Sequence, residues 1–463
     1  MNRVEIPNGL LEILERTPEL GQAFLVGGCV RDHLLGFHVT DYDIEAYKVS
    51  YEALAKGLRR WGRVDLVGRS FGVIKLQLRD GNAYDFALPR RDSKTAPGHK
   101  GFQVQVDENI EPREAAERRD FTINSMMFDP RTGLFMDFFG GRLDLDNRLL
   151  RHTSAAFSED PLRVLRGMQL ASRFKLVAAP QTLDLCRSIR ASYRELAIER
   201  VREEWFKWAA RSSSPSHGLR FLREADWLSH FPEINALRGV AQEPEWHPEG
   251  DVFTHTCHSL DALVNLPEWS NAMESDRVVL SFAVLAHDFA KPATTQTAMK
   301  EGVQRIVSPG HEEQGGPIAE GFLKRIGVPP AFIQRVVPLV SNHLAHLQTA
   351  TDRSVRRLAL RLQPETIDHL CTVIKADQFG RPPKPKEPSS SLLNLHERAR
   401  ELNLQKAAPK PILMGRDLLE RGLAPSPRFK KILDAAFEAQ LESVFLDAQG
   451  AQAWLDKYLE PTL

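Results

Sequence analysis

Short apolar runs separated by turn residues dominate the beginning of the chain. The runs that predict β-strands, each bounded by Gly, Asp or Asn, are residues 23–26, 73–78, 83–88 and 101–106. Between them, apolar positions at helical spacing predict a helix over residues 51–61. The first third of the chain is therefore expected to be α/β.

The pattern changes to helical from about residue 158 onward. Residues 181–211 place large apolar side chains among charged ones, as amphipathic helices do. The polar segment 211–218 (RSSSPSHG) interrupts these helices. Residues 381–391 (RPPKPKEPSSS), with four prolines and three serines, predict an extended linker before the last helices.

Composition and charge exclude several classes of protein. The chain has 463 residues, enough for about three domains. It is 42% apolar and 26% charged, which is typical of a globular protein, and has no apolar run long enough for a membrane span. Acidic residues within the first twenty argue against a signal peptide. With 61 basic and 61 acidic residues, the net charge of zero argues against non-specific coating of nucleic acid but permits a local basic groove.

The cysteines indicate the redox compartment. They are far apart and form no CxxC pair, so neither a disulfide framework nor a cysteine zinc site is expected. A reducing cytoplasm fits this usage. The four residues are Cys29, Cys186, Cys257 and Cys371.

Two features near the first expected strand suggest phosphate chemistry. Gly27 and Gly28 follow the strand directly, where glycines let the backbone approach a phosphate, although an ordinary tight turn also explains them. Asp41 and Asp43 are two positions apart on an expected strand, so their carboxylates would share a face about 6.6 Å apart. Mg²⁺ ions would relieve their repulsion, whereas a solvated turn is the alternative.

Five segments together carry a family resemblance. Residues 27–36 (GGCVRDHLLG) with the following DYD resemble the first motif of the class II tRNA nucleotidyltransferase and poly(A) polymerase family. The resemblance covers roughly residues 20–210. The other matching segments, in the family's order, are RRDFTINSM (118–126), DFFGGRLDL (137–145), FSEDPLRVLR (157–166) and IERVREE (198–204).

The resemblance implies a catalytic carboxylate set. Asp41 and Asp43 would hold Mg²⁺ ions. Asp85, which follows the apolar pair 83–84, is a candidate for a third carboxylate on a neighbouring strand, and an Asp that caps a turn is an equally open alternative.

The resemblance also implies a nucleotide site. In this site, Gly28 and Arg31 would bind the triphosphate, and Arg119 and Asp120, supported by Asn124, would contact the sugar. Asp160 and Arg163 would read the edge of the base. If these two lie at i and i+3 of a helix, an acceptor and a forked donor face the base together, although a plain surface ion pair is the alternative. The implied nucleotide-binding residues are Gly27, Gly28, Arg31, Asp32, Arg119, Asp120, Asn124, Asp160, Arg163 and Arg166.

Each of two basic segments has two possible roles. Residues 89–100 fall where the family has a mobile loop that helps to switch from C to A addition, but a solvated loop is equally consistent. Residues 413–441 resemble a C-terminal segment found in family members with the second domain described below. This tail is expected to expose a solvated helical face, with contact to tRNA phosphates as the alternative. Its basic residues are Arg416, Arg428, Lys430 and Lys431.

Histidines and aspartates recur between residues 245 and 380. Together they resemble the HD phosphohydrolase superfamily, which implies a site for Mn²⁺, Ni²⁺, Fe²⁺ or Mg²⁺. Some bacterial CCA-adding enzymes with such a domain are associated with phosphatase and 2′,3′-cyclic phosphodiesterase activity. The implied ligands are His255, His287, Asp288 and Asp377, with His311 and His343 as a second metal or phosphate site and His258 as a substitute for His255.

The sequence thus predicts four parts. Residues 1–150 form an α/β nucleotidyltransferase head with a mixed sheet and flanking helices. Residues 151–245 form an all-α neck and body, residues 246–385 an all-α HD domain, and residues 386–463 a linker and helical tail.

The expected activity is template-independent addition of C and A to tRNA 3′ ends from CTP and ATP, with release of pyrophosphate, beside an HD phosphohydrolase. The alternatives are an A-adding or CC-adding specialist, a poly(A) polymerase, and a protein whose main activity is the HD hydrolase. Zero net charge and the HD residues argue against the poly(A) polymerase. The expected partners are tRNA, CTP and ATP, without a membrane or an obligate protein partner.

Overall fold

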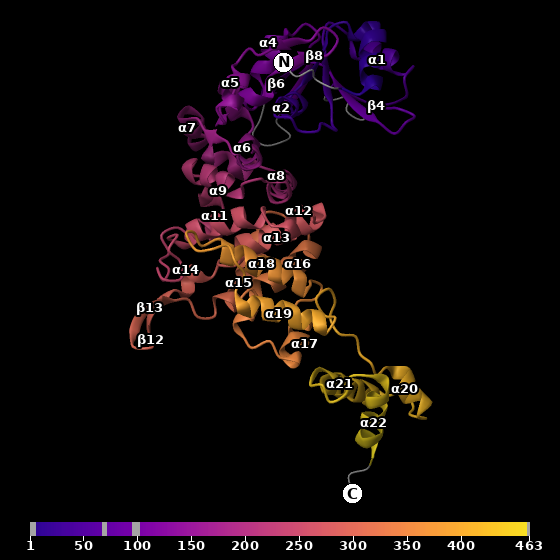
Figure 1. Ribbon diagram of the computed structural model, residues 1–463. Coiled ribbons are helices and arrows are strands. Elements are labelled where there is room, and N and C mark those ends of the chain that lie inside the picture. Colours follow the sequence, from indigo (N-terminus) through magenta and orange to yellow (C-terminus); the bar gives the residue numbers. More distant parts are fainter. Residues whose placement is uncertain (1–5, 67–71, 95–101, 461–463) are drawn as a thin grey trace. The chain divides into compact units, whose positions relative to one another are not determined.

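A computed structural model describes residues 6–66, 72–94 and 102–460. The chain forms two compact units. The first comprises Met1–Trp208 and His217–His230, and the second comprises Ala209–Ser216 and Phe231–Leu463. Figure 1 shows most strands near the N-terminus and helices along the rest of the chain. In the described ranges, no helix has the length and apolar character needed to cross a membrane.

A mixed sheet is the centre of the first unit. Among the described residues its seven strands are ordered β3-β4-β5-β2-β1-β8-β9. β2 and β5 are parallel, whereas the other neighbours are antiparallel, so the mixed sheet is as predicted. The strands are β1 (Ala23–Val26), β2 (Asp43–Ala46), β3 (Arg63–Asp65), β4 (Val73–Gln77), β5 (Ala83–Ala87), β8 (Met127–Asp129) and β9 (Leu134–Met136).

Short helices accompany this sheet. The first buries Leu10, Ile13 and Leu14, which lie on one helical face, so its amphipathic pattern directs it onto the core. Ser50 caps another by accepting a hydrogen bond from the Ala53 N–H, which fixes where that helix begins. These helices are α1 (Asn8–Arg16), α2 (Gly28–Leu34), α3 (Tyr51–Leu58), α4 (Pro112–Glu117) and α5 (Gly141–Asp146).

The chain then becomes helical, as the periodicity predicts. The apolar face of α6 is buried, and Trp205 and Trp208 of α8 are fully buried with their rings 5.2 Å apart. Such aromatic side chains contribute large buried areas to a core. The helices are α6 (Leu162–Phe174), α7 (Pro180–Ser188), α8 (Ile198–Arg211), α9 (Pro215–Glu224) and α10 (Pro232–Ala236).

The second unit is built around one central helix, α13. Residues 278–286 of α13 are all buried, so the residues directly after it enter the interior of the unit. α11, α16 and α18 pack against α13, and α19 packs against α18. The helices are α11 (Val252–Leu263), α12 (Pro267–Ser270), α13 (Glu274–Ala286), α14 (Lys291–Thr294), α15 (His311–Arg325), α16 (Pro330–Ser341), α17 (Asp352–Arg361), α18 (Ile367–Phe379) and α19 (Ser390–Glu401).

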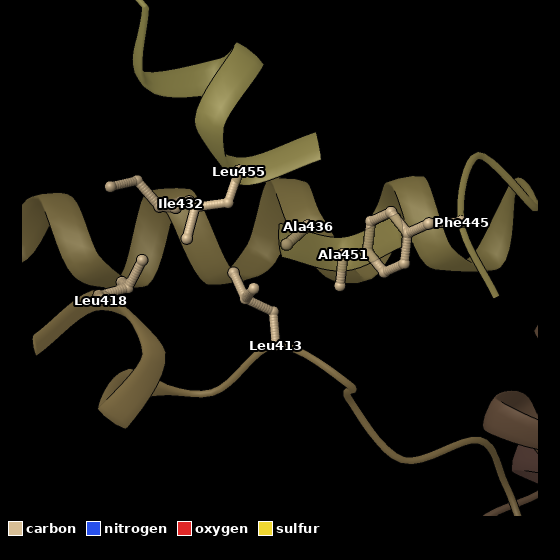
Figure 2. Close-up of a cluster of buried hydrophobic side chains, with 7 residues drawn as sticks. All are labelled: Leu413, Leu418, Ile432, Ala436, Phe445, Ala451 and Leu455. Carbon is tan, nitrogen blue, oxygen red and sulfur yellow. The ribbon is translucent and has the colours of Figure 1, made fainter. Parts of the chain in front are cut away.

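The C-terminal helices have a core of their own. Figure 2 shows Leu413, Ile432, Phe445 and Leu455 converging between α20 (Gly415–Glu420), α21 (Pro427–Leu441) and α22 (Ala448–Leu459). This cluster is small, and the expected helical tail is present.

The sequence analysis predicted neither β3, β8 and β9 of the main sheet nor the three strand pairs that the described residues form outside it, although β7 itself was expected. The antiparallel hairpin of β12 (Gln296–Lys300) and β13 (Val303–Val307) interrupts the part expected to be all helical. β6 (Arg90–Lys94) pairs with β7 (Phe102–Val106), so part of the basic segment 89–100 is a strand rather than a loop. Residues 95–100 of that segment lie outside the described residues. The two-residue strands β10 (Leu149–Leu150) and β11 (Val177–Ala178) form a short parallel pair.

The cysteine and linker predictions agree with the structure. All four cysteines are buried and none forms a disulfide. The proline-rich segment between α18 and α19 contains no helix or strand.

Candidate functional site

The glycine turn lies at the end of β1. Gly27 has a φ of +73°, a conformation that favours glycine, and α2 begins at Gly28. A Cβ on Gly27 would lie 3.0 Å from Nη1 of Arg119, so a side chain would also crowd that arginine. The expected strand and glycine turn are present, and the turn leads into α2.

The predicted aspartates lie at the start of β2. The strand begins at Asp43, so Asp41 precedes it, and the expectation that both lie on the strand is wrong. Both residues are nevertheless exposed while Tyr42 between them is buried, as in extended chain. Asp85 of β5 is the direct parallel partner of Asp43. Sheet register therefore brings together three carboxylates from two segments.

Negative charge accumulates at Asp43. Burial raises the pKa of its carboxyl, and the charge of Asp41 raises it further, as do Asp85 and Glu45, whereas Arg119 lowers it. Arg119 therefore does not offset the combined effect of burial and the three acidic groups on this carboxyl. Carboxylate oxygens with excess negative charge form the ligand set that Mg²⁺ prefers, so the residues fit this ion.

Sequence reasoning missed Glu45, which lies two residues after Asp43 on the same strand. Its Oε2 lies 3.1 Å from Nη2 of Arg119 and accepts a hydrogen bond of 2.9 Å from the Tyr47 hydroxyl. Glu45 thereby holds Arg119 beside the glycine turn. The i+2 spacing from Asp43 was the available signal, because alternate strand residues share a face.

A buried network surrounds Asp120. Its carboxylate accepts hydrogen bonds from Arg166 Nε at 2.7 Å, Asn124 Nδ2 at 2.9 Å and the Phe121 N–H at 2.8 Å. Burial alone would raise the pKa of Asp120, but Arg166 and these hydrogen bonds lower it to about 2. Three residues from two separate motifs are therefore brought into direct contact.

The network continues to Arg31, which is buried. Its guanidinium donates to Asn124 and to Asp32, and lies 4.6 Å from the centre of the Phe174 ring. Arg173 also pairs with Asp32 at 2.8 Å. In this structure the hydrogen bonds of Arg31 thus orient neighbouring side chains of the fold.

Asp160 and Arg163 are not arranged as expected. Asp160 precedes α6, and its carboxylate accepts a 3.1 Å hydrogen bond from the Leu162 N–H, so the two residues are not i and i+3 within one helix. The Asp160 carboxylate pairs with Arg200 of α8 at 2.8 Å. Arg163 donates to two backbone oxygens, of Ala156 at 2.6 Å and of residue 118 at 2.7 Å. The argument from helical spacing did not anticipate that Arg200, from the fifth motif, would bind Asp160 instead.

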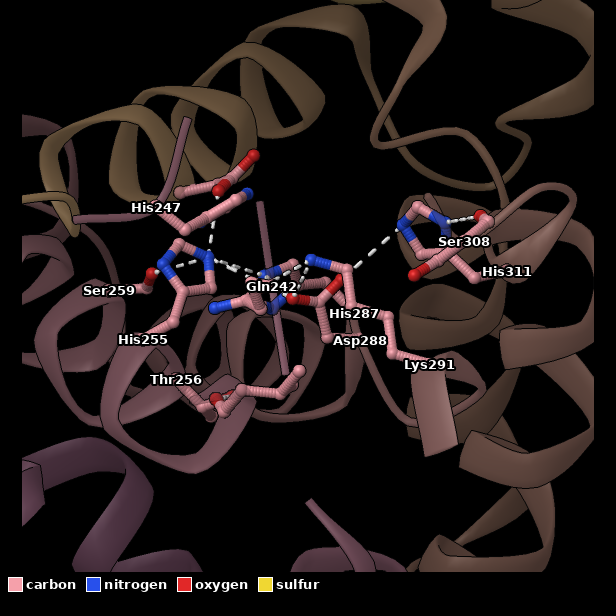
Figure 3. Close-up of polar contacts among 12 residues, drawn as sticks. Gln242, His247, His255, Thr256, Ser259, His287, Asp288, Lys291, Ser308 and His311 are labelled. Carbon is pink, nitrogen blue, oxygen red and sulfur yellow. Dashed lines mark hydrogen bonds and ion pairs between the residues drawn. The ribbon is translucent and has the colours of Figure 1, made fainter. Parts of the chain in front are cut away.

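The predicted HD residues converge in the second unit. His255 lies on α11, His287 and Asp288 directly follow α13, and Asp377 lies on α18. Figure 3 shows His255, His287 and Asp288 close to one another. All four are almost fully buried. His255 Nε2 lies 2.9 Å from Asp377 Oδ1, and His287 Nε2 lies 3.2 Å from Asp288 Oδ2.

Two further predicted histidines join the cluster. His311, at the start of α15, and His343, just after α16, have their Nε2 atoms 3.2 Å apart, and His311 Nε2 lies 3.4 Å from Asp288 Oδ1. His258 belongs to none of the potential metal-binding groups among the described residues, so it does not replace His255. The groups are His247–Glu249–His255, His255–His287–Asp288 and Asp288–His311–His343.

Backbone carbonyls orient three of these imidazoles. The Nδ1 atoms of His287, His311 and His343 lie 2.6–2.8 Å from the carbonyl oxygen three residues earlier. A carbonyl only accepts, so each Nδ1 carries the hydrogen and Nε2 faces the cluster. This is the arrangement that a metal-binding histidine requires.

The acids in the cluster are arranged for a cation. Within the described part of the chain, neither carboxylate oxygen of buried Asp288 has a hydrogen bond of good geometry, although Lys291 Nζ is 2.8 Å away. Burial lowers the pKa of His343 to about 3, helped by the charges of His287 and His311, which keeps its imidazole neutral. Imidazole nitrogens and buried carboxylates are ligand types that fit a divalent transition metal.

The sequence analysis missed several residues around this cluster. Glu249 Oε1 lies 2.7 Å from His255 Nδ1 and 2.9 Å from His247 Nδ1. Arg381 binds Asp377 at 2.7 Å, one helical turn away. The segment WHPEGD carried the signal for His247 and Glu249, because two potential ligands stand shortly before His255.

A cavity of about 530 Å³ opens onto the cluster. Such a volume is typical of small-molecule sites. Asp288, Lys291, His311, His343 and Arg381 contribute to its polar lining. A metal ion held by the buried ligands and the neighbouring basic side chains could together bind the negative charge of a phosphate group.

Comparisons with known proteins match both regions. Residues 23–151 match the poly A polymerase head domain, and residues 254–379 match the HD domain. The multifunctional CCA protein of Methylococcus capsulatus is 36% identical over 78% of this chain and 82% of its own length. That of Hahella chejuensis is 32% identical over 90% of this chain and 97% of its own.

Solved structures share the fold. A Bacillus stearothermophilus CCA-adding enzyme in complex with CTP aligns over 98% of both chains with a TM-score of 0.65 and 20% identity. A Thermotoga maritima CCA-adding enzyme complexed with tRNA aligns over 99% of this chain and 97% of its own with a TM-score of 0.61 and 17% identity. With its nucleotidyltransferase head and HD domain, the chain belongs to the multifunctional CCA protein family.

Proposed function

We propose that the first unit adds C and A to tRNA 3′ ends, using CTP and ATP and releasing pyrophosphate. The observation that carries this proposal is the convergence of Asp41, Asp43 and Asp85 beside the Gly27 turn. In the reaction, the tRNA 3′-hydroxyl oxygen bonds to the α-phosphorus while the bond to pyrophosphate breaks. Mg²⁺, when bound by Asp41 and Asp43, supplies positive charge to the triphosphate and to the attacking oxygen.

The chain's own residues position the reactants. The glycine turn leaves room for a phosphate, and Asp85, beside Asp43, is the candidate acceptor for the hydroxyl proton. Arg119, which Glu45 holds next to the turn, supplies charge close to the nucleotide. Positioning and fixed charge account for most catalysis in phosphoryl transfer.

The remaining predicted residues form the nucleotide pocket in this proposal. Arg119 and Asp120 contact the sugar, while Asn124 joins Asp120 to Arg31. Arg166 neutralises Asp120 and adds positive charge. Gly28, Arg31 and Asp32 support the triphosphate side, where the Arg31 network fixes the walls of the pocket.

Base recognition follows from two residues that are otherwise engaged in this structure. Asp160 exchanges Arg200 for the base edge, and Arg163 exchanges backbone carbonyls for it. A carboxylate acceptor and a guanidinium donor can together match the edges of C and A. We propose that the nucleotide competes for these two groups when it binds.

We further propose a phosphohydrolase activity for the HD cluster, favoured by the buried His255–His287–Asp288–Asp377 arrangement. A divalent metal, such as Mn²⁺, Ni²⁺, Fe²⁺ or Mg²⁺, supplies a Lewis acid for the phosphate when bound. For a 2′,3′-cyclic phosphate, a water oxygen bonds to phosphorus as one P–O bond to the ribose breaks. The released ribose oxygen takes the proton that the water loses, which frees one hydroxyl of the ribose.

The test is nucleotide incorporation with Mg²⁺ on a tRNA transcript that ends before CCA, resolved to single nucleotides. CTP alone, ATP alone and both together are compared. Addition of two C and one A, with no further extension, is expected. Failure to use CTP would overturn the proposal; on a tRNA ending in CC, a single A would then indicate an A-adding specialist and a long tail a poly(A) polymerase. Two C without A would indicate a CC-adding specialist.

A further inference from the structure

Trp246 stands at the rim of the HD cavity. Its side chain lines the cavity and remains 37% exposed, which is unusual for a tryptophan beside polar and charged groups. On the same rim, Leu347 is 69% exposed. The cavity therefore has an apolar mouth above the charged floor that contains Asp288 and Lys291.

The backbone around Trp246 is held from two sides. The N–H groups of Trp246 and His247 donate to the carbonyl oxygen of Glu243 at 3.0 and 2.8 Å, which forms a tight turn. The Glu243 carboxylate accepts hydrogen bonds from Arg305 at 2.9 Å and from the Ile306 N–H at 3.0 Å, both in β13. The β12–β13 hairpin is thereby fastened to the turn that presents the indole.

The next residue connects this turn to the metal cluster. His247 Nδ1 lies 2.9 Å from Glu249, which also contacts His255. Trp246 is thus one residue from a potential metal-binding group, and its position is set by the same turn. An aromatic surface held in this way loses little conformational freedom when a ligand binds.

The charges near the indole favour an anionic ligand. The Lys300 ammonium and the Arg305 guanidinium lie over the Trp246 ring, 5.6 and 5.7 Å from its centre, so a base that stacks there must displace the exposed Lys300 side chain. Arg305 is engaged by Glu243 and Glu245, whereas Lys300 is exposed and lines the cavity. An aromatic face beside an accessible cation is how proteins bind the bases and phosphates of a single strand.

We propose that Trp246 stacks on the terminal base of the RNA whose phosphate occupies the HD cluster, making the cavity selective for nucleotides over base-free phosphates. This inference rests on the proposed phosphohydrolase. The floor receives the phosphate and the rim receives the base, and the volume of about 530 Å³ is adequate for one nucleotide. Because every base has a stacking face, the selectivity is for the presence of a base rather than for its identity.

The test compares two cyclic phosphates with the metal-loaded full chain. One is 2′,3′-cyclic AMP, and the other is glycerol 1,2-cyclic phosphate, which has the same five-membered ring but no base. Trp246→Ala is expected to lower the ratio of kcat/KM for the nucleotide to that for the glycerol compound by about tenfold, mainly through KM. Trp246→Phe, which keeps a stacking ring, is expected to restore most of the ratio.

Met299→Ala is the matched control, because Met299 is an exposed apolar residue of the same hairpin that does not line the cavity. It is expected to leave the ratio unchanged. An unchanged ratio in Trp246→Ala, with both compounds hydrolysed, would overturn the stacking role and leave the phosphohydrolase intact. Hydrolysis of neither compound by the wild-type chain would instead overturn the proposed activity.

A binding measurement without turnover tests the stacking role of Trp246 separately from the proposed phosphohydrolase activity. Adenosine 2′-monophosphate is titrated into the chelator-treated full chain, and tryptophan fluorescence and calorimetry are recorded. Quenching is expected in the wild type, and in Trp246→Phe the heat of binding persists while most quenching is lost. Equal binding of the nucleotide by wild type and Trp246→Ala would contradict the proposal whatever the hydrolase does.

Discussion

The two candidate sites gather acidic groups in opposite ways. At the transferase site, Asp41 and Asp43 lie on the exposed side of their segment. Burial of the Asp43 carboxyl raises its pKa, and the charges of Asp41, Asp85 and Glu45 raise it further, with only Arg119 opposing them. At the HD cluster, Asp288 and Asp377 are buried. Burial would raise the pKa of both acids, yet nearby histidines, Lys291 and Arg381 bring it well below the usual value.

The difference indicates when each site becomes complete. A buried carboxylate is costly unless it is paired, so folding itself must supply partners for the HD acids. Among the charged groups that act on Asp43, only Arg119 is basic, so cations that arrive with the nucleotide would supply the missing positive charge. The transferase site therefore depends on its ligands for balanced charge, whereas the HD site is largely assembled by the fold.

The largest expected effect is that of Asp43→Ala on nucleotide addition. Removal of a metal-binding carboxylate should lower the incorporation rate on the order of 10³-fold, since metal ions contribute several kcal/mol to such reactions. Hydrolysis by the HD site should be unchanged. The matched control is Asp80→Ala in the exposed turn between β4 and β5. Loss of both activities in a folded variant would refute the assignment of two independent sites.

The Asp288→Asn variant tests the HD site, where the acidic residues are buried. It keeps the volume of the side chain but removes a charge that faces His287, Lys291 and His311. Hydrolysis of 2′,3′-cyclic AMP should fall by about 10²–10³-fold with nucleotide addition retained. Rates are measured for both reactions on the same preparation. Full hydrolase activity in this variant would place the metal elsewhere.

A smaller effect is expected on stability from Asp120→Asn. Arg166 and two hydrogen bonds lower the pKa of Asp120 to about 2, which corresponds to about 2 kcal/mol of stability at pH 7. Because the folded-state pKa is below that of the unfolded chain, this contribution is complete above about pH 4 and is lost as the pH falls toward 2. Urea unfolding of variant and wild type should differ at pH 7 and converge in acid.

The control for this variant is Asp146→Asn, whose exposed i,i+4 pair with Arg142 should contribute less than about 0.5 kcal/mol. A difference between Asp120→Asn and wild type that does not shrink in acid would show that the loss arises from packing rather than from charge.

The smallest predicted change concerns the choice of nucleotide. Asp160→Ala should reduce the preference for CTP and ATP over UTP by about tenfold, since one good hydrogen-bonded pair to a base contributes about 1–3 kcal/mol. Incorporation of each nucleotide is measured separately, with Asp184→Ala on exposed α7 as the control. Retained selectivity would mean that Asp160 serves only as the partner of Arg200.

Local patterns in the sequence were enough to predict the mixed head and the helical remainder, and to nominate the residues of both candidate sites. Apolar runs bounded by turn residues predicted β1, β4, β5 and β7 to within a residue, because local pattern and core burial agree there. The HD residues were found from their types and order. The hairpin β12–β13 was missed because its strands are largely exposed, so they lack a clear apolar alternation.

Which of these residues contact one another depends on how the folded elements pack. The pairing of Asp43 with Asp85 is a matter of sheet register, and the Asp120–Arg166 contact joins helices and turns that are far apart in the chain. The engagement of Asp160 by Arg200 displaced the expected helical pair. Hydrophobic periodicity specifies which face of an element is buried, whereas contacts between polar side chains depend on how separate elements pack. For that reason Glu45, Glu249 and Trp246 became visible as functional candidates only in the folded chain.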